Sequence, residues 1–425
     1  MQALLSLSIA LLAGLMLSRV AKLLNLPAVT AYLVAGILVG PYVIGRIGLH
    51  GLGFISLEDV ESYSILCDVA LGFIAFSIGN EFRLSQLKKI GKQATVIGIF
   101  QALITTVVVD AALIALHFAI PDKFSLSAAI VLGAVATATA PAATLMVVRQ
   151  YKAKGPLTDI LLPVVALDDA VGLVVFAISF GVAKALNAGS VSILSIILEP
   201  LLEVILSLVL GFIMGILFTF CERFFHSRSK RLAMSVTFVL LTVALSMIEF
   251  EIAGVHVAFS SLLVCMMLGA VFCNICDFSE ELMDRVDRWT APLFVLFFVL
   301  SGAELELDVF ADLAIVIIGV VYIIARSAGK YFGAFASAKA VKCNDNIVKY
   351  LGVTLLPQAG VALGMAIKAT ALGTDGNIVS NITLFAVLIY ELVGPLLTKI
   401  ALTKAGDITP EGKTSARDVA QKSAQ

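Results

Sequence analysis

The sequence predicts an all-α polytopic membrane protein with about thirteen transmembrane helices. First, 60% of its 425 residues are hydrophobic and only 14% are charged, with a mean hydropathy of +1.04; soluble globular chains are less apolar and carry more charge. Second, apolar stretches of about 20 residues, enough to cross a bilayer core, recur almost from end to end. Third, proline interrupts two of these stretches near their middle. We therefore expect thirteen spans, two of them broken.

The spans follow from the apolar stretches between charged residues or Gly/Pro breaks. The first stretch lacks the basic region that precedes a cleaved signal, so it is counted as a span. Residues 1–404 form one membrane domain, and the polar segment 405–425 is expected to be a short disordered tail. We expect no soluble nucleotide-binding regulatory domain. The expected spans are 2–22, 27–46, 59–80, 93–118, 125–148, 158–186, 195–220, 231–249, 255–275, 289–303, 309–338, 347–370 and 378–403.

The charges of the loops predict the orientation. Most of the 29 Lys and Arg residues lie in every second loop, and these loops are all on one side of the membrane. The loops on the other side carry acidic residues such as Asp59, Glu304 and Asp375. Loops rich in Lys and Arg face the cytoplasm. We therefore expect the N-terminus outside and the C-terminus inside. The net charge of −1 indicates no nucleic-acid partner.

Neither cofactor nor enzyme chemistry is expected. The six cysteines are scattered, and the close pair Cys273 and Cys276 has no second pair or histidine nearby, so these residues are interpreted as packing residues. The four histidines are dispersed and form no metal set.

The strongest functional signal is a pair of adjacent carboxylates, Asp168 and Asp169, in the sixth span. They lie about ten residues after Thr158, roughly 15 Å into the helix, which is close to the bilayer midplane. Charges at that depth are costly and usually functional, although both carboxylates could simply be satisfied by neighbouring groups. Desolvation favours a protonated carboxylate and a nearby cation favours the ionised one. One aspartate can therefore choose between a proton and a metal ion.

The second signal is a pair of broken spans. The fifth span carries Thr137, Thr139 and Pro141 halfway along, and the twelfth carries Pro357 and Gln358. Proline removes a backbone donor and frees carbonyls, which is tolerated at membrane depth where the backbone lines an ion site. Each break alone could be only a kink. The two broken spans are the fifth and the twelfth, an odd number of spans apart, so they run in opposite directions, as an inverted-topology repeat requires.

Further charged residues fall inside or beside the membrane. Arg326 and Lys330 lie one turn apart in the eleventh span, on the same helix face. Asp68, Asp110 and Glu391 are interpreted as hydrogen-bonding core residues, with a relay role as the alternative. The run Glu280, Glu281, Asp284 and Asp287 is interpreted as a solvated face that could also attract cations to a cytoplasmic funnel.

Several motifs in order resemble the monovalent cation:proton antiporters, specifically the two-aspartate, electrogenic bacterial branch of cation:proton antiporter family 2. They are FIAFSIGNEF, TATAPAATL, LDDAVGL, GKYFG and LPQAGVALG. The resemblance covers nearly the entire chain. It implies a homodimer in which spans 1, 2, 7, 8 and 9 form a dimer domain, while spans 3–6 and 10–13 form a mobile core domain.

The resemblance also implies residue roles. Asp169 would take the cation or the proton, and Asp168 would pair with a basic residue of the eleventh span. Lys330 fits that role better than Arg326, because the stretch to Pro357 then aligns without a gap. Thr139 would supply an oxygen near the ion, with Thr137 a weaker candidate. Gln358 departs from the charged residue that many relatives carry there.

The expected function is electrogenic exchange of Na⁺ or Li⁺ for protons across a bacterial cytoplasmic membrane, by an elevator-like alternating-access mechanism. A K⁺/H⁺ antiporter or K⁺ efflux system on the same scaffold is the alternative. A cation channel is disfavoured because no filter-like carbonyl loop repeats. An organic-anion symporter is disfavoured because two aspartates repel an anion.

Overall fold

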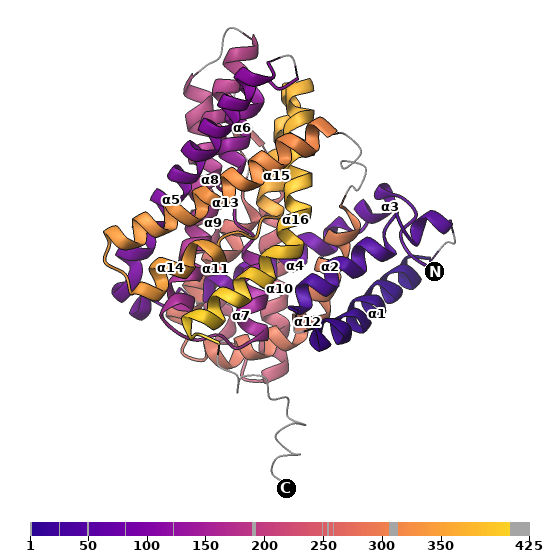
Figure 1. Ribbon diagram of the computed structural model, residues 1–425. Helices are drawn as coiled ribbons and strands as arrows, with labels where there is room; N and C mark the ends of the chain where they lie inside the picture. The colour runs from indigo at the N-terminus through magenta and orange to yellow at the C-terminus, as the bar shows by residue number, and fades with distance from the viewer. Residues whose placement is uncertain are drawn as a thin grey trace.

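The protein is a bundle of helices (Figure 1). The computed structural model describes residues 2–24, 26–48, 51–80, 82–121, 123–188, 193–248, 250–252, 255–257, 259–305 and 313–408. The first half contains α1 (Gln2–Leu23), α2 (Ala28–Val39), η1 (Gly45–Ile47), α3 (Leu57–Glu61), α4 (Ser64–Asn80), α5 (Leu84–Ala119), α6 (Leu126–Val135), α7 (Pro141–Gln150) and α8 (Pro156–Ala188). The second half contains α9 (Ile193–Glu222), α10 (Arg228–Ser246), β1 (Phe250–Ile252), β2 (Val255–Val257), α11 (Ser261–Ile275), α12 (Ser279–Ala303), α13 (Leu313–Ala340), α14 (Asp345–Thr354), α15 (Gly360–Ala369), η3 (Thr370–Leu372) and α16 (Thr374–Ala405).

The all-helical membrane architecture is confirmed. Within the described residues, eight helices are long and apolar enough to cross a membrane. The shorter α2, α4 and α11 coincide with three further expected spans, and the pairs α6/α7 and α14/α15 coincide with the two spans that were expected to be broken. The expected tail lies mostly outside the described residues, which end at 408.

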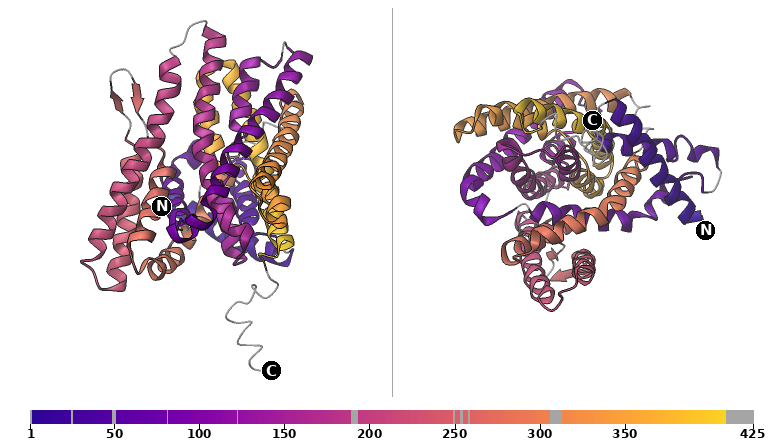
Figure 2. Two further views of the ribbon diagram at one scale, coloured as in Figure 1. Left: turned by 90° about the vertical axis from the view of Figure 1, so that its left-hand side faces the viewer. Right: turned by 90° about the horizontal axis from the view of Figure 1, so that it is seen from below.

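Several expected spans have different boundaries; the span expected at 289–303, for example, begins at Ser279. The span expected at 255–275 begins only at Ser261, because β1 and β2 pair antiparallel before it; FEI and VHV alternate apolar and polar residues, the period of a strand. This hairpin stands at one end of the molecule (Figure 2, left). The span expected at 27–46 is helical only to Val39, since Gly40 is extended before Pro41, and the residue before a proline avoids the helical region.

The two broken spans run in opposite directions and meet. In Figure 1 the chain passes from α6 down to α7, and from α14 up to α15. The backbone N–H of Ala140, in the first break, donates to the carbonyl of Pro357, in the second, at 2.8 Å. Each break is thus held by the other, as expected of two crossing broken helices.

The helices pack in two groups, which meet in an apolar cluster shared by α7 and α8 with α4, α9, α11 and α12. Residues of α5, α6, α7, α8, α13, α14, α15 and α16 build two apolar clusters. On the other side, α12 packs against α1, α2 and α4, and α4 packs against α11. The contact of α2 with α12 is close, since a Cβ on Gly36 would lie 2.0 Å from the carbonyl oxygen of Val299. The third and tenth spans, α4 and α12, therefore pack with the helices expected in the dimer domain.

Candidate cation and proton site

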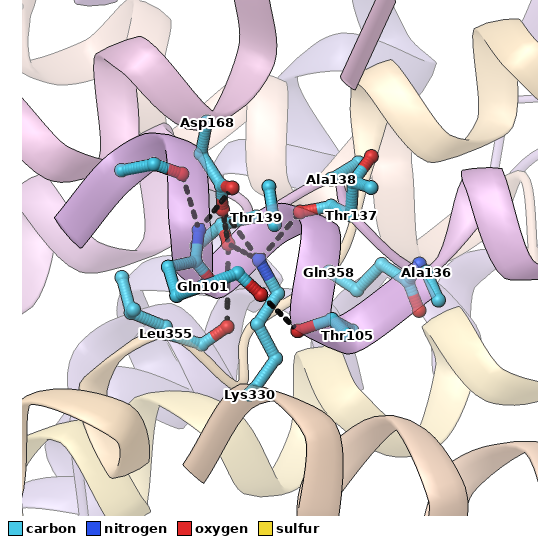
Figure 3. A network of polar contacts seen from close by, with 12 residues as sticks. Gln101, Thr105, Ala136, Thr137, Ala138, Thr139, Asp168, Lys330, Leu355 and Gln358 are labelled. Atoms are coloured by element: carbon cyan, nitrogen blue, oxygen red, sulfur yellow. Dashed lines mark hydrogen bonds and ion pairs between the residues drawn. The ribbon is translucent and has the colours of Figure 1, made fainter. Parts of the chain in front are cut away.

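Asp168 of α8 is the centre of a buried polar network (Figure 3). The ammonium of Lys330, from α13, lies 2.5 Å from Oδ2. The hydroxyl of Thr139, in the first break, donates to the same oxygen at 2.5 Å. The amide of Gln101, from α5, donates to Oδ1. Four elements thus converge on one carboxylate, and its charge is matched by a cation and two further donors, the arrangement that a buried ion pair requires.

Lys330 is also tied to the first break. Its ammonium donates to the carbonyl of Thr137 at 2.5 Å and to the hydroxyl of Thr139 at 3.0 Å. With Asp168, this accounts for all three donors of an ammonium. The carbonyl of Thr137 is available because α6 ends at Val135. The hydroxyl of Thr137 instead donates back to Ala134, so Thr137 enters the network through its backbone.

Arg326 has a different position from Lys330, although sequence alone left the two as alternatives. Its guanidinium donates to the carbonyls of Ala136 at 3.0 Å and Ala138 at 2.6 Å, and to that of Leu356 at 2.8 Å. It also lies over the ring of Tyr390, 4.5 Å from the centroid. Arg326 therefore binds carbonyls that both breaks leave free, whereas Lys330 lies against Asp168.

Asp169 is buried but has no such partners. Its side chain is 1% exposed, and neither carboxylate oxygen has a hydrogen-bond partner among the described residues. Successive helical residues point about 100° apart, so Asp169 points in a different direction from Asp168 while remaining next to it in α8. Burying an unpaired carboxylate is costly. The side chain can therefore be stable here with a proton or a cation bound.

The second break contributes neutral groups. The Gln358 amide donates to the carbonyl of Val135 at 3.0 Å and to the hydroxyl of Tyr322 at 2.9 Å. The carbonyl of Pro357 accepts from Ala140, as described above. Leu355 also offers its carbonyl to the hydroxyl of Thr139 at 3.3 Å. The break thus stabilises the crossing without adding a charge.

Sequence reasoning missed Gln101 and Tyr322. Both are fully buried, but they were not predicted, because the prediction rested on charged residues and on the two breaks. A lone glutamine in the otherwise apolar stretch GIFQALI is the signal that could have found Gln101. Asp110, left open by the sequence, abuts α6, where a Cβ on Gly133 would lie 1.7 Å from its Oδ1.

The comparison with protein families decides the identity. A family model described as the transmembrane region of sodium/hydrogen exchangers matches residues 7–404. The chain belongs to the sodium/hydrogen exchanger family. This exchanger is therefore a multi-pass membrane transporter and not an enzyme, and its substrates are monovalent cations and protons.

Individual relatives of the exchanger are distant but cover nearly its whole length. It is 24% identical to the K⁺/H⁺ antiporter subunit KhtU of Bacillus subtilis, over 90% of this chain and 89% of that protein. It is 23% identical to the Na⁺/H⁺ antiporter NhaS4 of Synechocystis, over 92% and 94% respectively. Its fold matches two structures of the sodium proton antiporter MjNhaP1 from Methanocaldococcus jannaschii. One has a TM-score of 0.67 at 18% identity, covering 95% of this chain and 99% of that one; the other has 0.71 at 17%, covering 94% of each.

Proposed function

We propose that this protein exchanges Na⁺ or Li⁺ for protons across a bacterial cytoplasmic membrane, as an electrogenic member of the two-aspartate branch of cation:proton antiporter family 2. The observation that carries the proposal is Asp169, a fully buried carboxylate without a hydrogen-bond partner among the described residues, next to the paired Asp168. Such a group is neutralised by one proton or one cation at a time, so the two substrates exclude each other. This competition couples their fluxes.

The ligands of the cation would come from the same place. Asp169 supplies the charge, and oxygens of Asp168, Thr139 and Thr137 are nearby candidates on α8 and the first break. Lys330 would leave Asp168 when the cation arrives and return when it departs. An ammonium can release its proton in a desolvated site, whereas a guanidinium practically cannot. Lys330 can thus carry a second proton per cycle, which makes the exchange electrogenic.

Movement of one helix group against the other would provide alternating access. We propose that α5–α8 and α13–α16 form the mobile unit and that α1–α4 and α9–α12 form the fixed unit and the homodimer contact. The resemblance had placed α4 and α12 in the mobile unit. Their packing against α11 and α2, respectively, supports the fixed unit instead.

A polar cavity supports entry of cations from the side we assign to the cytoplasm. It has a volume of about 690 Å³, and its lining includes Arg83, Arg149, Glu280 and Asp287. Arg149 of α7 and Asp287 of α12 form an ion pair of 2.7 Å across the two units. The acidic run of α12 therefore borders a cavity, which supports the interpretation of this run as part of a cytoplasmic funnel. The ion pair between Arg149 and Asp287 would have to break when the two units move.

K⁺/H⁺ exchange is the second candidate, because the K⁺/H⁺ antiporter subunit KhtU is as similar to this chain as the Na⁺/H⁺ antiporter NhaS4 is. The test is transport by the purified protein in proteoliposomes that carry an imposed proton gradient and a pH-sensitive dye. We expect Na⁺ or Li⁺ to dissipate the gradient, while choline leaves it intact. A response to K⁺ alone selects the second candidate. Equal responses to choline, or none to any cation, refute exchange.

A further inference from the structure

A second buried carboxylate lies outside the site described above. Glu391, in the middle of α16, is 4% exposed, and its Oε2 has no hydrogen-bond partner among the described residues. The preceding Tyr390 points to α13, where its hydroxyl donates to the carbonyl of Ile323 at 2.8 Å. The following Leu392 offers its carbonyl to Thr30 of α2 at 3.5 Å. Glu391 therefore lies where the mobile α16 meets the fixed unit.

Another carboxylate, Glu304, lies just beyond the end of α12, and its neighbour Leu305 packs in the same apolar cluster as Leu388 of α16. Burial, together with the neighbouring Asp68 and Glu61 carboxylates, raises the pKa of Glu304 to about 7. Glu61 is exposed, Asp68 and Glu304 are half-buried, and Glu391 is buried. In Figure 1, α3, which carries Glu61, lies well below the upper ends of α6 and α16.

Among the described residues, no basic side chain on the helices packed on α16 is paired with these carboxylates. Lys184 of α8 and Lys339 of α13 lie over the rings of Phe180 and Phe335. The helices α2 and α6 carry no Asp, Glu, Lys or Arg, and the charged residues of α14 lie at the end of α14 that is far from Glu391. Arg326 binds backbone carbonyls and Lys330 binds Asp168, while Arg149 of α7 and Lys368 of α15 pair with Asp287 and Glu203.

The chemistry favours a proton as the ligand. A metal cation needs several oxygen ligands at once, and no group of three or more His, Cys, Asp or Glu in the described part of the chain could hold one. A single buried carboxylate needs only one proton to become neutral. A row of carboxylates without counter-charges can pass that proton, one O–H bond breaking as the next forms, between water and a buried position.

We propose that Glu391, Glu304 and Asp68 form a proton-binding relay, separate from Asp169, which exchanges protons with the outer medium where α16 contacts the fixed unit. Glu391 holds the proton on the mobile unit, and Glu304 and Asp68 exchange it with water on the fixed unit. The relay rests on the proposed cation/proton exchange and adds a second proton-binding place to it. Because it opens to one face, it makes exchange depend on outer pH through residues that inner pH does not reach.

The test measures exchange in right-side-out and inside-out membrane vesicles while the pH on each face is varied separately. Glu391→Gln and Glu304→Gln should each shift the midpoint of the outer-pH dependence by about one unit, a tenfold change in proton affinity. The double variant should add little to either. The inner-pH dependence and the cation KM should stay at wild-type values. Glu58→Gln, an exposed carboxylate of α3, is the matched control and should behave as wild type.

A second measurement tests the relay even if a variant fails to transport. Infrared difference spectra during a pH titration should show the carbonyl bands of protonated carboxyls. Glu391→Gln should remove one component that Asp169→Asn retains. Unchanged outer-pH dependence in both single variants, or an infrared spectrum of Glu391→Gln that has lost no carboxyl component, overturns the relay. Absence of exchange by the wild type refutes the proposed function instead, whereas the infrared band still decides the relay.

Discussion

Replacing Lys330 by glutamine separates the coupling role of the basic helix from its structural role. The ammonium makes three buried contacts, one of them to Asp168 at 2.5 Å. Removing one partner of a buried ion pair costs about 3–5 kcal/mol, because the other charge stays buried and uncompensated. Part of this loss is recovered, since the glutamine amide can still donate to Asp168 or to the carbonyl of Thr137. We therefore expect a folded protein of lower stability that exchanges slowly and has lost its dependence on membrane voltage.

Arg326→Gln is the matched control one turn away. Arg326 makes three charge-assisted hydrogen bonds to backbone carbonyls of both breaks, at 2.6–3.0 Å. Each is worth about 1.5–3 kcal/mol, and a glutamine amide replaces at most two of them without the charge. Arg326→Gln should therefore lower the melting temperature more than Lys330→Gln does. Whatever exchange remains should still respond to voltage.

The assay is exchange in proteoliposomes with and without a K⁺/valinomycin potential, alongside thermal unfolding of the same preparations. If Arg326→Gln abolishes the voltage response and Lys330→Gln keeps it, the two roles are reversed and the reasoning from the Asp168 contact is refuted. If the wild type shows no voltage response, the exchange is electroneutral and Lys330 carries no proton.

Three other substitutions test the remaining parts of the site. Asp169→Asn should abolish exchange and preserve the fold, because an amide cannot alternate between a proton and a metal ion; near-normal exchange by this variant would move the site elsewhere, with Glu391 the next carboxylate to test. Thr139→Ala should raise the apparent KM for the cation several-fold with a smaller effect on kcat, since one oxygen beside the ion is lost; an unchanged KM counts against that role. Gln101→Leu removes a buried donor to Asp168 and should destabilise the protein by about 1–3 kcal/mol. A thermal scan that equals wild type would show that this hydrogen bond contributes nothing to stability.

Much of the fold follows from local properties of the chain. Hydropathy alone predicts the spans, because burial in lipid demands a run of apolar residues long enough to cross. Proline marks the breaks at Pro141 and Pro357, because it cannot donate the hydrogen bond that a helix needs, although Pro163, Pro292 and Pro395 lie inside continuous helices. The hairpin before α11 escaped this reasoning, since a short apolar stretch is compatible with either a strand or a buried helix.

Spacing along the sequence did not fix the partners of the buried charges, and only the resemblance favoured Lys330 over Arg326 as the partner of Asp168. Arg326 and Lys330 share a helix face and are equivalent to any rule based on spacing. Only the crossing of the two breaks brings the carbonyls of Ala136, Ala138 and Leu356 to one of them and Asp168 to the other. Gln101 became part of the site in the same way.

The sequence by itself therefore determined which segments enter the membrane and which carboxylates and prolines they carry there. The tertiary structure decided that Asp168 is paired and that Asp169 is left without a hydrogen-bond partner among the described residues. The physical reason is the distance along the chain over which each effect acts. Hydropathy and proline act within one helix, whereas a buried charge is satisfied by groups that lie far away along the chain, as Lys330 lies from Asp168.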